Sequence, residues 1–147
     1  MRKVTKLALL INVTIFMVDR LIKHRATQGL VPFSQNNKLF FLNVSQNLTV
    51  IISLTIITVL LVFLTKELKG KDLLLIACGS IILGGLSNLY DRITLGFVID
   101  YLPLFSFSQF NLSDALISFG CFLIAIRIIK DNKKTKTEKH CEILKKR

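Results

Sequence analysis

Residues 48–65 read LTVIISLTIITVLLVFLT and residues 73–90 read LLLIACGSIILGGLSNLY, and these two runs decide the fold. Each run has eighteen residues without an Asp, Glu, Lys or Arg. Eighteen residues wound as an α-helix reach about 27 Å, close to the thickness of the hydrocarbon core of a bilayer. A soluble domain of 147 residues has no use for two helices that are apolar all round. The runs therefore predict an all-α membrane protein.

Two shorter apolar segments, at about 4–22 and 112–129, complete a set of four predicted transmembrane helices. Basic residues precede the first segment as in a signal peptide, but no small-x-small cleavage site follows it, so a retained helix is favoured. We predict one four-helix membrane domain over residues 1–130. Residues 131–147 form a basic tail whose composition is typical of disorder.

The charged residues predict how the helices cross the membrane. The chain has 20 Lys plus Arg against 9 Asp plus Glu, a net charge of +11. Four spans place both termini on one side, and that side, with the loop between the second and third spans, holds 15 of the basic residues. Positive charge stays in the cytoplasm, so both termini are predicted to be cytoplasmic. Membrane lipids, and not nucleic acid, are the partners that this charge predicts.

Cysteine and histidine give no sign of a metal site. The three cysteines, Cys78, Cys121 and Cys141, have no CxxC spacing, and His24 and His140 are predicted on opposite sides of the membrane. This pattern supports neither a disulfide framework nor a zinc site. No metal or other cofactor is predicted.

Four aspartates, by contrast, gather at the outer ends of the predicted spans: Asp19, Asp91, Asp100 and Asp114. Ionisable groups are expensive at membrane depth, so a chain this apolar is expected to keep them for a reason. Lys23 follows Asp19 by one helical turn, in the favourable order for an ion pair on one helix face. Taken by itself, that pair is better explained as a structural anchor than as a catalytic one.

The end of the third span combines small and polar residues. Gly84, Gly85 and Ser87 would let another helix approach its backbone closely. Asn88 and Asp91 lie three positions apart and share a face, and Arg92 can pair with a nearby carboxylate. If this segment stood alone, a polar helix end with its own ion pair would be the favoured explanation.

Asp100 and Asp114 are the candidates for acid–base chemistry. Asp100 follows a stretch of Val, Ile and Phe typical of a strand, and Asp114 lies in the first turn of the last span, where helix capping alone would account for it. If the two face each other, they cannot both ionise cheaply and would share one proton. Such a pair supplies a general base and a general acid without a metal.

The chain resembles lipoprotein signal peptidase (signal peptidase II), a family of bacterial membrane aspartic peptidases, over roughly residues 4–129. Three motifs carry the resemblance. Asp19-x-x-x-Lys23 resembles the family's first motif and is weakly specific. The long motif Asn88-x-x-Asp91-Arg92-x-x-x-Gly96-x-Val98-x-Asp100 resembles the family's third motif and is strongly specific, and Phe110-Asn111-x-x-Asp114 resembles its final motif.

The resemblance implies an aspartic endopeptidase with Asp100 and Asp114 as its catalytic pair. One would activate water against the peptide carbonyl, and the other would polarise that carbonyl or supply its proton. The implied substrate is a prolipoprotein, cut before a diacylglyceryl-modified cysteine at the outer face of the bacterial inner membrane. The implied fold adds a small extracytoplasmic β-element and a helix-bearing loop over the active site. The residues implied to bind substrate or stabilise the site are Asn88, Asp91, Arg92, Asn111, Asp19, Lys23, Asn43 and Gly96.

The sequence departs from the family pattern in three places. The family's second motif reads Asn-x-Gly-x-Ala-Phe, and residues 43–48 here read NVSQNL, which keeps only Asn43. Because Gly permits backbone conformations that Ser45 disfavours, the shape of the substrate-binding lip is expected to differ. Ser87 replaces the usual Gly and Ser113 the usual Ala. A hydroxyl beside Asp114 can hydrogen-bond a carboxylate and lower its pKa.

The sequence argues against three other functions: a transporter or channel subunit, an inactive relative of the family and a soluble aspartic peptidase. A transporter or channel subunit would place a charge at mid-membrane, but the two central spans have none. An inactive relative would lack one member of the Asp100/Asp114 pair, and both are present. A soluble aspartic peptidase would carry an Asp-Thr/Ser-Gly motif, which this sequence lacks. No oligomeric state follows from the sequence, and a monomer is compatible with it.

Overall fold

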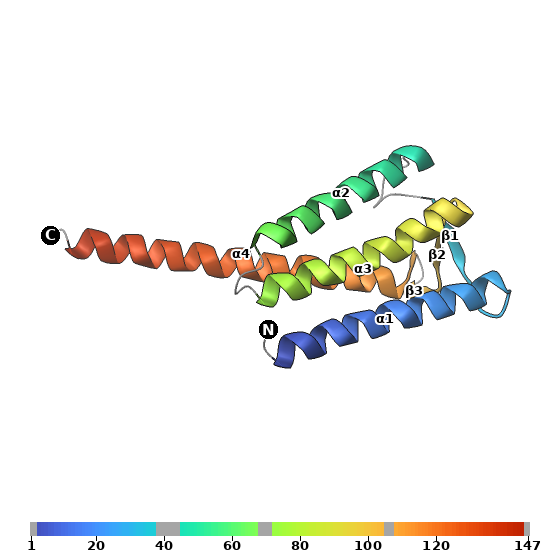
Figure 1. Cartoon of the computed structure of the whole chain (residues 1–147), viewed down its shortest axis with the longest axis horizontal. Helices are drawn as coiled ribbons and strands as arrows, with labels where there is room; N and C mark the ends of the chain where they lie inside the picture. The colour runs from blue at the N-terminus through green and yellow to red at the C-terminus, as the bar shows by residue number, and fades with distance from the viewer. Residues whose placement is uncertain (1–2, 38–44, 68–71, 105–107, 146–147) are drawn as a thin grey trace.

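A computed structural model describes residues 3–37, 45–67, 72–104 and 108–145, and these residues contain four α-helices and four short strands. The helices lie side by side along the long axis of the molecule, and the strands gather at one end, opposite the C-terminus (Figure 1). The elements in chain order are α1 (Lys3–Thr27), β1 (Ser34–Asn36), α2 (Gln46–Glu67), α3 (Asp72–Leu95), β2 (Val98–Asp100), β3 (Leu102–Leu104), β4 (Ser108–Phe110) and α4 (Leu112–Lys145).

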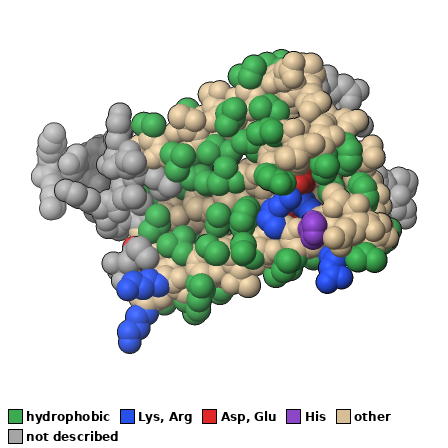
Figure 2. Space-filling model, turned by 45° about the vertical axis from the view of Figure 1, so that its right-hand side comes forward, with side chains coloured by type: hydrophobic (Ala, Val, Ile, Leu, Met, Phe, Trp, Pro, Cys, Tyr) green, Lys and Arg blue, Asp and Glu red, His purple; other side chains and the backbone are tan. Residues whose placement is uncertain are grey.

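Three helices of the described residues are long and apolar enough to cross a membrane: Gln46–Phe63 in α2, Asp72–Leu95 in α3 and Leu112–Asp131 in α4. They match the second, third and fourth predicted spans. The predicted first span forms a helix of 25 residues, α1, but the charged side chains along α1 keep it outside this set. Figure 2 shows hydrophobic side chains distributed along the helices, while acidic and basic side chains meet near the end that carries the strands.

The helix α4 continues to Lys145, through the segment whose composition is typical of disorder. Lys and Glu have high helix propensity, so a basic segment that extends an established helix can remain helical. The sequence predicts that the last helix ends near residue 129 and that a tail with the composition of a disordered segment follows, but the helix continues past this change of composition.

The helix α3 is the centre of the bundle and packs against α1, α2 and α4. Its contact with α4 depends on Gly84, where an added Cβ would meet the backbone carbonyl of Ser113. This close approach confirms the role predicted for Gly84, whereas a Cβ at Gly85 would make only ordinary contact with Ile57. Midway along the bundle, the side chain of Asn12 on α1 donates a hydrogen bond to Ser80 Oγ on α3, 2.8 Å away.

Two antiparallel strand pairs connect the helices at the end of the bundle. β1 pairs with β2, with Ser34 opposite Asp100, and β3 pairs with β4. Gly96 has a φ of 87°, and its N–H donates to the Arg92 carbonyl, which ends α3 and turns the chain into β2. The predicted strand before Asp100 is confirmed. Residues 38–44, between β1 and α2, lie outside the described residues.

Candidate active site

Asn111 joins the two candidate catalytic carboxylates. Its Nδ2 donates to Asp100 Oδ1, 2.7 Å away, and its backbone N–H donates to Asp114 Oδ2 over 3.4 Å. Its Oδ1 accepts a hydrogen bond from the backbone N–H of Asp114 at 2.9 Å. A single residue immediately before α4 thus contacts both acids, through its side chain and its backbone. Asn111 therefore links Asp100 and Asp114 within one hydrogen-bonded group.

The same contacts form a capping box at the N-terminus of α4. Asn111 immediately precedes α4, and Asp114 is its third residue, so each side chain accepts a hydrogen bond from the backbone N–H of the other. Capping therefore does account for part of the role of Asp114, as the sequence analysis allowed. It does not exhaust that role, because Asp114 Oδ1 also accepts a hydrogen bond from Asn88 Nδ2 on α3 at 2.8 Å.

Asp100 lies at the end of β2 and is buried. Burial, together with the nearby negative charge of Asp114, raises the pKa of its carboxyl from 3.8 to about 6. Hydrogen bonds from Asn36 and Asn111 act in the opposite direction, because they stabilise the ionised form. Asp100 can thus carry a proton at a pH where an exposed aspartate is fully ionised.

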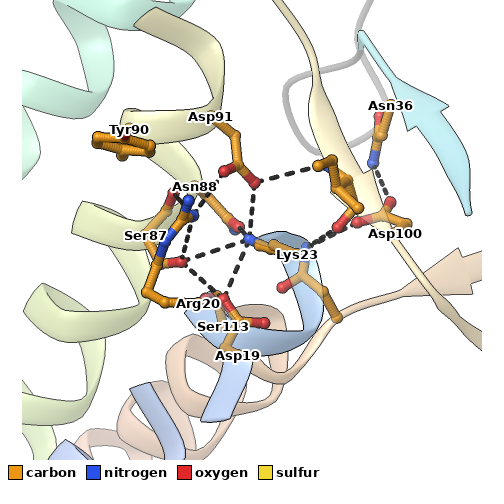
Figure 3. Close-up of polar contacts among 12 residues, drawn as sticks. Asp19, Arg20, Lys23, Asn36, Ser87, Asn88, Tyr90, Asp91, Asp100 and Ser113 are labelled. Atoms are coloured by element: carbon orange, nitrogen blue, oxygen red, sulfur yellow. Dashed lines mark hydrogen bonds and ion pairs between the residues drawn. The ribbon is translucent and has the colours of Figure 1, made fainter. Parts of the chain in front are cut away.

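The other two aspartates face cations. Lys23 Nζ lies 3.2 Å from Asp19 Oδ2 and 2.9 Å from Asp91 Oδ2, and all three side chains are fully buried (Figure 3). Arg20, whose guanidinium stacks over the Tyr90 ring, lies 2.6 Å from Asp91 Oδ1. The predicted pairing of Asp19 with Lys23 is confirmed, and Asp91 joins it.

The four carboxylates therefore fall into two classes. Each oxygen of Asp100 and Asp114 accepts a hydrogen bond from a neutral amide, whereas Asp19 and Asp91 are paired with positive charge. The described site holds four carboxylates against three cations, namely Arg20, Lys23 and the Arg92 that interacts electrostatically with three of the acids. One proton shared by the amide-bound pair would make this buried cluster neutral, the arrangement that an acid–base pair needs.

Three hydroxyl groups complete the cluster, and sequence reasoning missed how they are used. Ser87 and Ser113 both donate to Asp19 Oδ2, so the hydroxyl of Ser113 serves Asp19 and not its neighbour Asp114. Tyr101 Oη donates to Asp19 Oδ1 at 2.8 Å. Burial raises the pKa of the Tyr101 phenol far above its usual value, so it stays a donor. The one feature of the sequence that could have pointed to Tyr101 as a site residue is its position directly after Asp100.

Two further contributors, Asn36 and Arg20, also went unnoticed in the sequence. The sequence around Asn36 does not predict a role in the site, because Asn36 comes close to Asp100 through the pairing of β1 with β2. The predicted residue Arg92 interacts electrostatically with Asp91, Asp100 and Asp114. Together with the predicted Gly96, it also lines an open hollow of about 180 Å³, whose other lining residues are Asn37, Gln46 and Thr49. Asn43, predicted as a binding residue, lies outside the described residues.

Comparison with known proteins shows the family to which the chain belongs. The family model described as signal peptidase (SPase) II matches residues 11–130. Proteins named lipoprotein signal peptidase are 38% identical over 87 residues in Ectopseudomonas mendocina and 36% identical over 85 residues in Streptococcus agalactiae. These alignments cover 55% of this chain and 52% and 55% of those relatives, so the chain matches about half of their length.

The fold is shared with solved structures. A bacterial membrane enzyme determined by the in meso method at 2.3 Å resolution superposes with a TM-score of 0.78 at 21% identity, over 88% of this chain and 91% of that one. A second such structure, at 1.9 Å resolution, gives a TM-score of 0.74 at 23% identity, over 86% and 94%. The family match covers most of the chain, including all four aspartates, and three of its helices can cross a membrane. This multi-pass membrane protein belongs to the signal peptidase II family.

Proposed function

We propose that this protein is an aspartic endopeptidase that removes signal peptides from prolipoproteins by cleaving before a diacylglyceryl-modified cysteine. One observation carries the proposal: Asp100 and Asp114, bridged by Asn111, are held by neutral amides while the neighbouring aspartates are held by cations. Such a pair can retain a single proton, which is the state that catalyses peptide hydrolysis by general acid and general base.

The reaction proceeds in two steps. The ionised member of the pair accepts a proton from water as the water oxygen attacks the peptide carbonyl carbon, while the protonated member donates its proton to the carbonyl oxygen. The resulting diol collapses: one of its hydroxyls gives its proton back to the ionised member of the pair, the C–N bond breaks, and the amine of the lipidated cysteine leaves with the proton of the other member. The pair begins and ends with one proton, so the site needs no metal and no other cofactor.

The remaining polar residues hold the pair in place. Asn88 orients Asp114, Asn111 orients both acids, and Lys23 fixes Asn88 by donating to its Oδ1 at 2.9 Å. Asp19 and Asp91 hold Lys23 from opposite sides. For Arg92 and Gly96, which line the hollow, and for Asn43 we propose contact with the substrate.

The proposed substrate fits a site at the membrane surface. A diacylglyceryl group keeps the cysteine at the depth of the lipid head groups while the signal helix stays in the bilayer. The carboxylates lie where α1 and α3 end and α4 begins, at the strand-bearing end of the bundle (Figure 1). We therefore assign this end to the outer face of the bacterial inner membrane, with four spanning helices in a domain of residues 1–130 and a cytoplasmic tail at 131–147.

The proposal is tested with purified protein in lipid and a diacylglyceryl-modified prolipoprotein, whose products are identified by mass. Wild type is expected to cut immediately before the modified cysteine. Asp100→Asn and Asp114→Asn should each lower kcat by about 10³-fold or more, because the pair loses its base or its acid. Asp131→Asn is the matched control, since Asp131 lies on the same helix as Asp114 but near its middle, where it pairs with Arg127.

Folding of each variant is checked by thermal unfolding before its activity is compared. Cleavage by wild type that survives both substitutions would move the catalytic acids elsewhere, to Asp91 first. Well-folded wild type that cuts none of several lipidated substrates would refute the proposed function itself.

A further inference from the structure

One carboxylate oxygen of Asp19 receives hydrogen bonds from two other helices. Ser87 Oγ on α3 donates to Asp19 Oδ2 at 2.6 Å, and Ser113 Oγ on α4 donates to the same atom at 2.5 Å (Figure 3). Lys23 Nζ, one turn further along α1, lies 3.2 Å from that oxygen. Three helices thus converge on a single atom.

This junction is inaccessible to water. The side chains of Asp19, Lys23, Ser87 and Ser113 are each 0% exposed. A buried carboxylate without donors would be costly, whereas short hydrogen bonds from hydroxyls to an ionised oxygen are among the strong ones in proteins. The two serine hydroxyls therefore fix both the charge and the direction of the Asp19 carboxylate.

From Asp19 the contacts lead to Asp114 through two side chains. Lys23 Nζ donates to Asn88 Oδ1 at 2.9 Å, and Asn88 Nδ2 donates to Asp114 Oδ1 at 2.8 Å. An amide group has one acceptor end and one donor end, so the ammonium group determines which way Asn88 presents itself to the catalytic acid. Any movement of Lys23 toward Asp91 or Asp19 would change that orientation.

The second oxygen of Asp19 leads to the other side of the catalytic pair. Tyr101 Oη donates to Asp19 Oδ1 and accepts a hydrogen bond from the backbone N–H of Leu112 at 3.3 Å. Tyr101 directly follows Asp100, and Leu112 directly follows Asn111. The orientation of one carboxylate therefore influences the segments that carry both catalytic aspartates.

From these contacts we infer that Ser87 and Ser113 are positioning residues for catalysis: by fixing Asp19 they hold Lys23 and Asn88 in the arrangement that Asp114 requires. The inference rests on the proposed peptidase function. It assigns to two small hydroxyl side chains a role beyond helix packing, even though neither lies within hydrogen-bond distance of the catalytic pair.

The test compares Ser87→Ala, Ser113→Ala and the double variant with Ser80→Ala in the cleavage assay on lipidated prolipoprotein. Ser80 is a matched control because it is a fully buried α3 serine that also hydrogen-bonds α1, through Asn12, but away from the aspartates. Each single variant at the junction should lower kcat by about tenfold with little change in KM. The fold-decrease in kcat of the double variant should be smaller than the product of the two single fold-decreases, because both hydroxyls act on one oxygen. Ser113→Thr, which keeps the hydroxyl, should restore most of kcat.

The outcomes separate the inference from the function on which it rests. If Ser87→Ala and Ser113→Ala lower thermal stability as Ser80→Ala does but leave kcat at the wild-type value, the two serines are structural only and the inference is wrong. If one of them fails to fold, the other, on a different helix, carries the same prediction. Absence of cleavage by wild type refutes the proposed function and is distinguishable from either result.

Discussion

At the scale of single residues, the site gives different acidities to side chains of one chemical type. Asp19 lies against an ammonium group and three hydroxyls, so its charge is compensated. Asp100 is equally buried, but the described hydrogen-bond donors to its two oxygens are amide groups, and its pKa is raised to about 6. The difference comes from the partners of each carboxylate and not from its depth.

Asn36 is the residue through which the strand pair adjusts the acidity of Asp100. Its Nδ2 donates to Asp100 Oδ2 at 2.9 Å, which favours the ionised carboxylate. We predict that Asn36→Ala raises the pKa of Asp100 further above about 6. The pair would then keep its proton to higher pH, and the alkaline limb of the pH profile of kcat/KM should move up by roughly half to one pH unit.

The measurement is the pH profile of kcat/KM for wild type, Asn36→Ala and Gln35→Ala. Gln35 is the neighbouring exposed residue of β1, and alternation along a strand turns it away from Asp100. Gln35→Ala should keep the wild-type limb. A limb that stays in place, or moves to lower pH, in Asn36→Ala would show that this hydrogen bond does not control the pair.

At the scale of elements, the approach of α3 to α4 sets the position of the catalytic helix. Gly84 leaves room for the backbone carbonyl of Ser113, the residue before Asp114. Gly85, its neighbour on α3, would place a Cβ in ordinary contact with Ile57, 3.5 Å away. A methyl group at position 84 would therefore clash with α4, whereas one at position 85 would fit.

We predict that Gly84→Ala lowers the free energy of unfolding by about 1–3 kcal/mol, because the added methyl group forces the helices apart. It should also lower kcat, because Asp114 moves with α4. Gly85→Ala should be neutral or slightly stabilising, since Ala is the better helix former and its methyl group has space. Denaturation in detergent, with the cleavage assay beside it, measures both effects. Equal stability of the two variants would contradict this account of the α3–α4 contact.

At the scale of the whole molecule, the helices separate a polar, strand-bearing end from the end where the chain begins and ends (Figure 1). The hydrophobic side chains between these ends are exposed in the isolated molecule and suit a lipid environment. Examples along three helices are Leu10, Ile51, Val59, Phe122 and Ile128. This arrangement gives the proposed topology a direct test.

We predict that a membrane-impermeant maleimide labels Gln35→Cys in intact spheroplasts, while the native Cys141 reacts only after the membrane is permeabilised. Gln35 is exposed on β1 at the strand-bearing end, and Cys141 belongs to the C-terminal segment proposed to be cytoplasmic. Cys78 is buried and should remain unlabelled in both conditions. Because Cys121 is exposed, a background with both Cys121→Ser and Cys141→Ser isolates the signal from residue 35. The reverse labelling pattern would invert the proposed topology.

Features of this protein that depend on local pattern could be predicted from the amino-acid sequence. Uncharged runs predicted the two central helices, because burying a charge in lipid is expensive wherever it occurs. The i,i+4 spacing predicted the Asp19–Lys23 pair, and the first turn of a helix predicted the capping role of Asp114. Order and spacing of the motifs were enough to single out Asp100 and Asp114.

The partners of each carboxylate, by contrast, depend on how the helices and strands pack together. Asn36 reaches Asp100, and Ser87 and Ser113 reach Asp19, across 64 to 94 positions of sequence. Such contacts follow from strand register and from how closely the helices pack, neither of which leaves a periodic mark in the chain. The residue types were visible in the sequence, but the division of four aspartates into an ion-paired and an amide-bound set is a property of their packing.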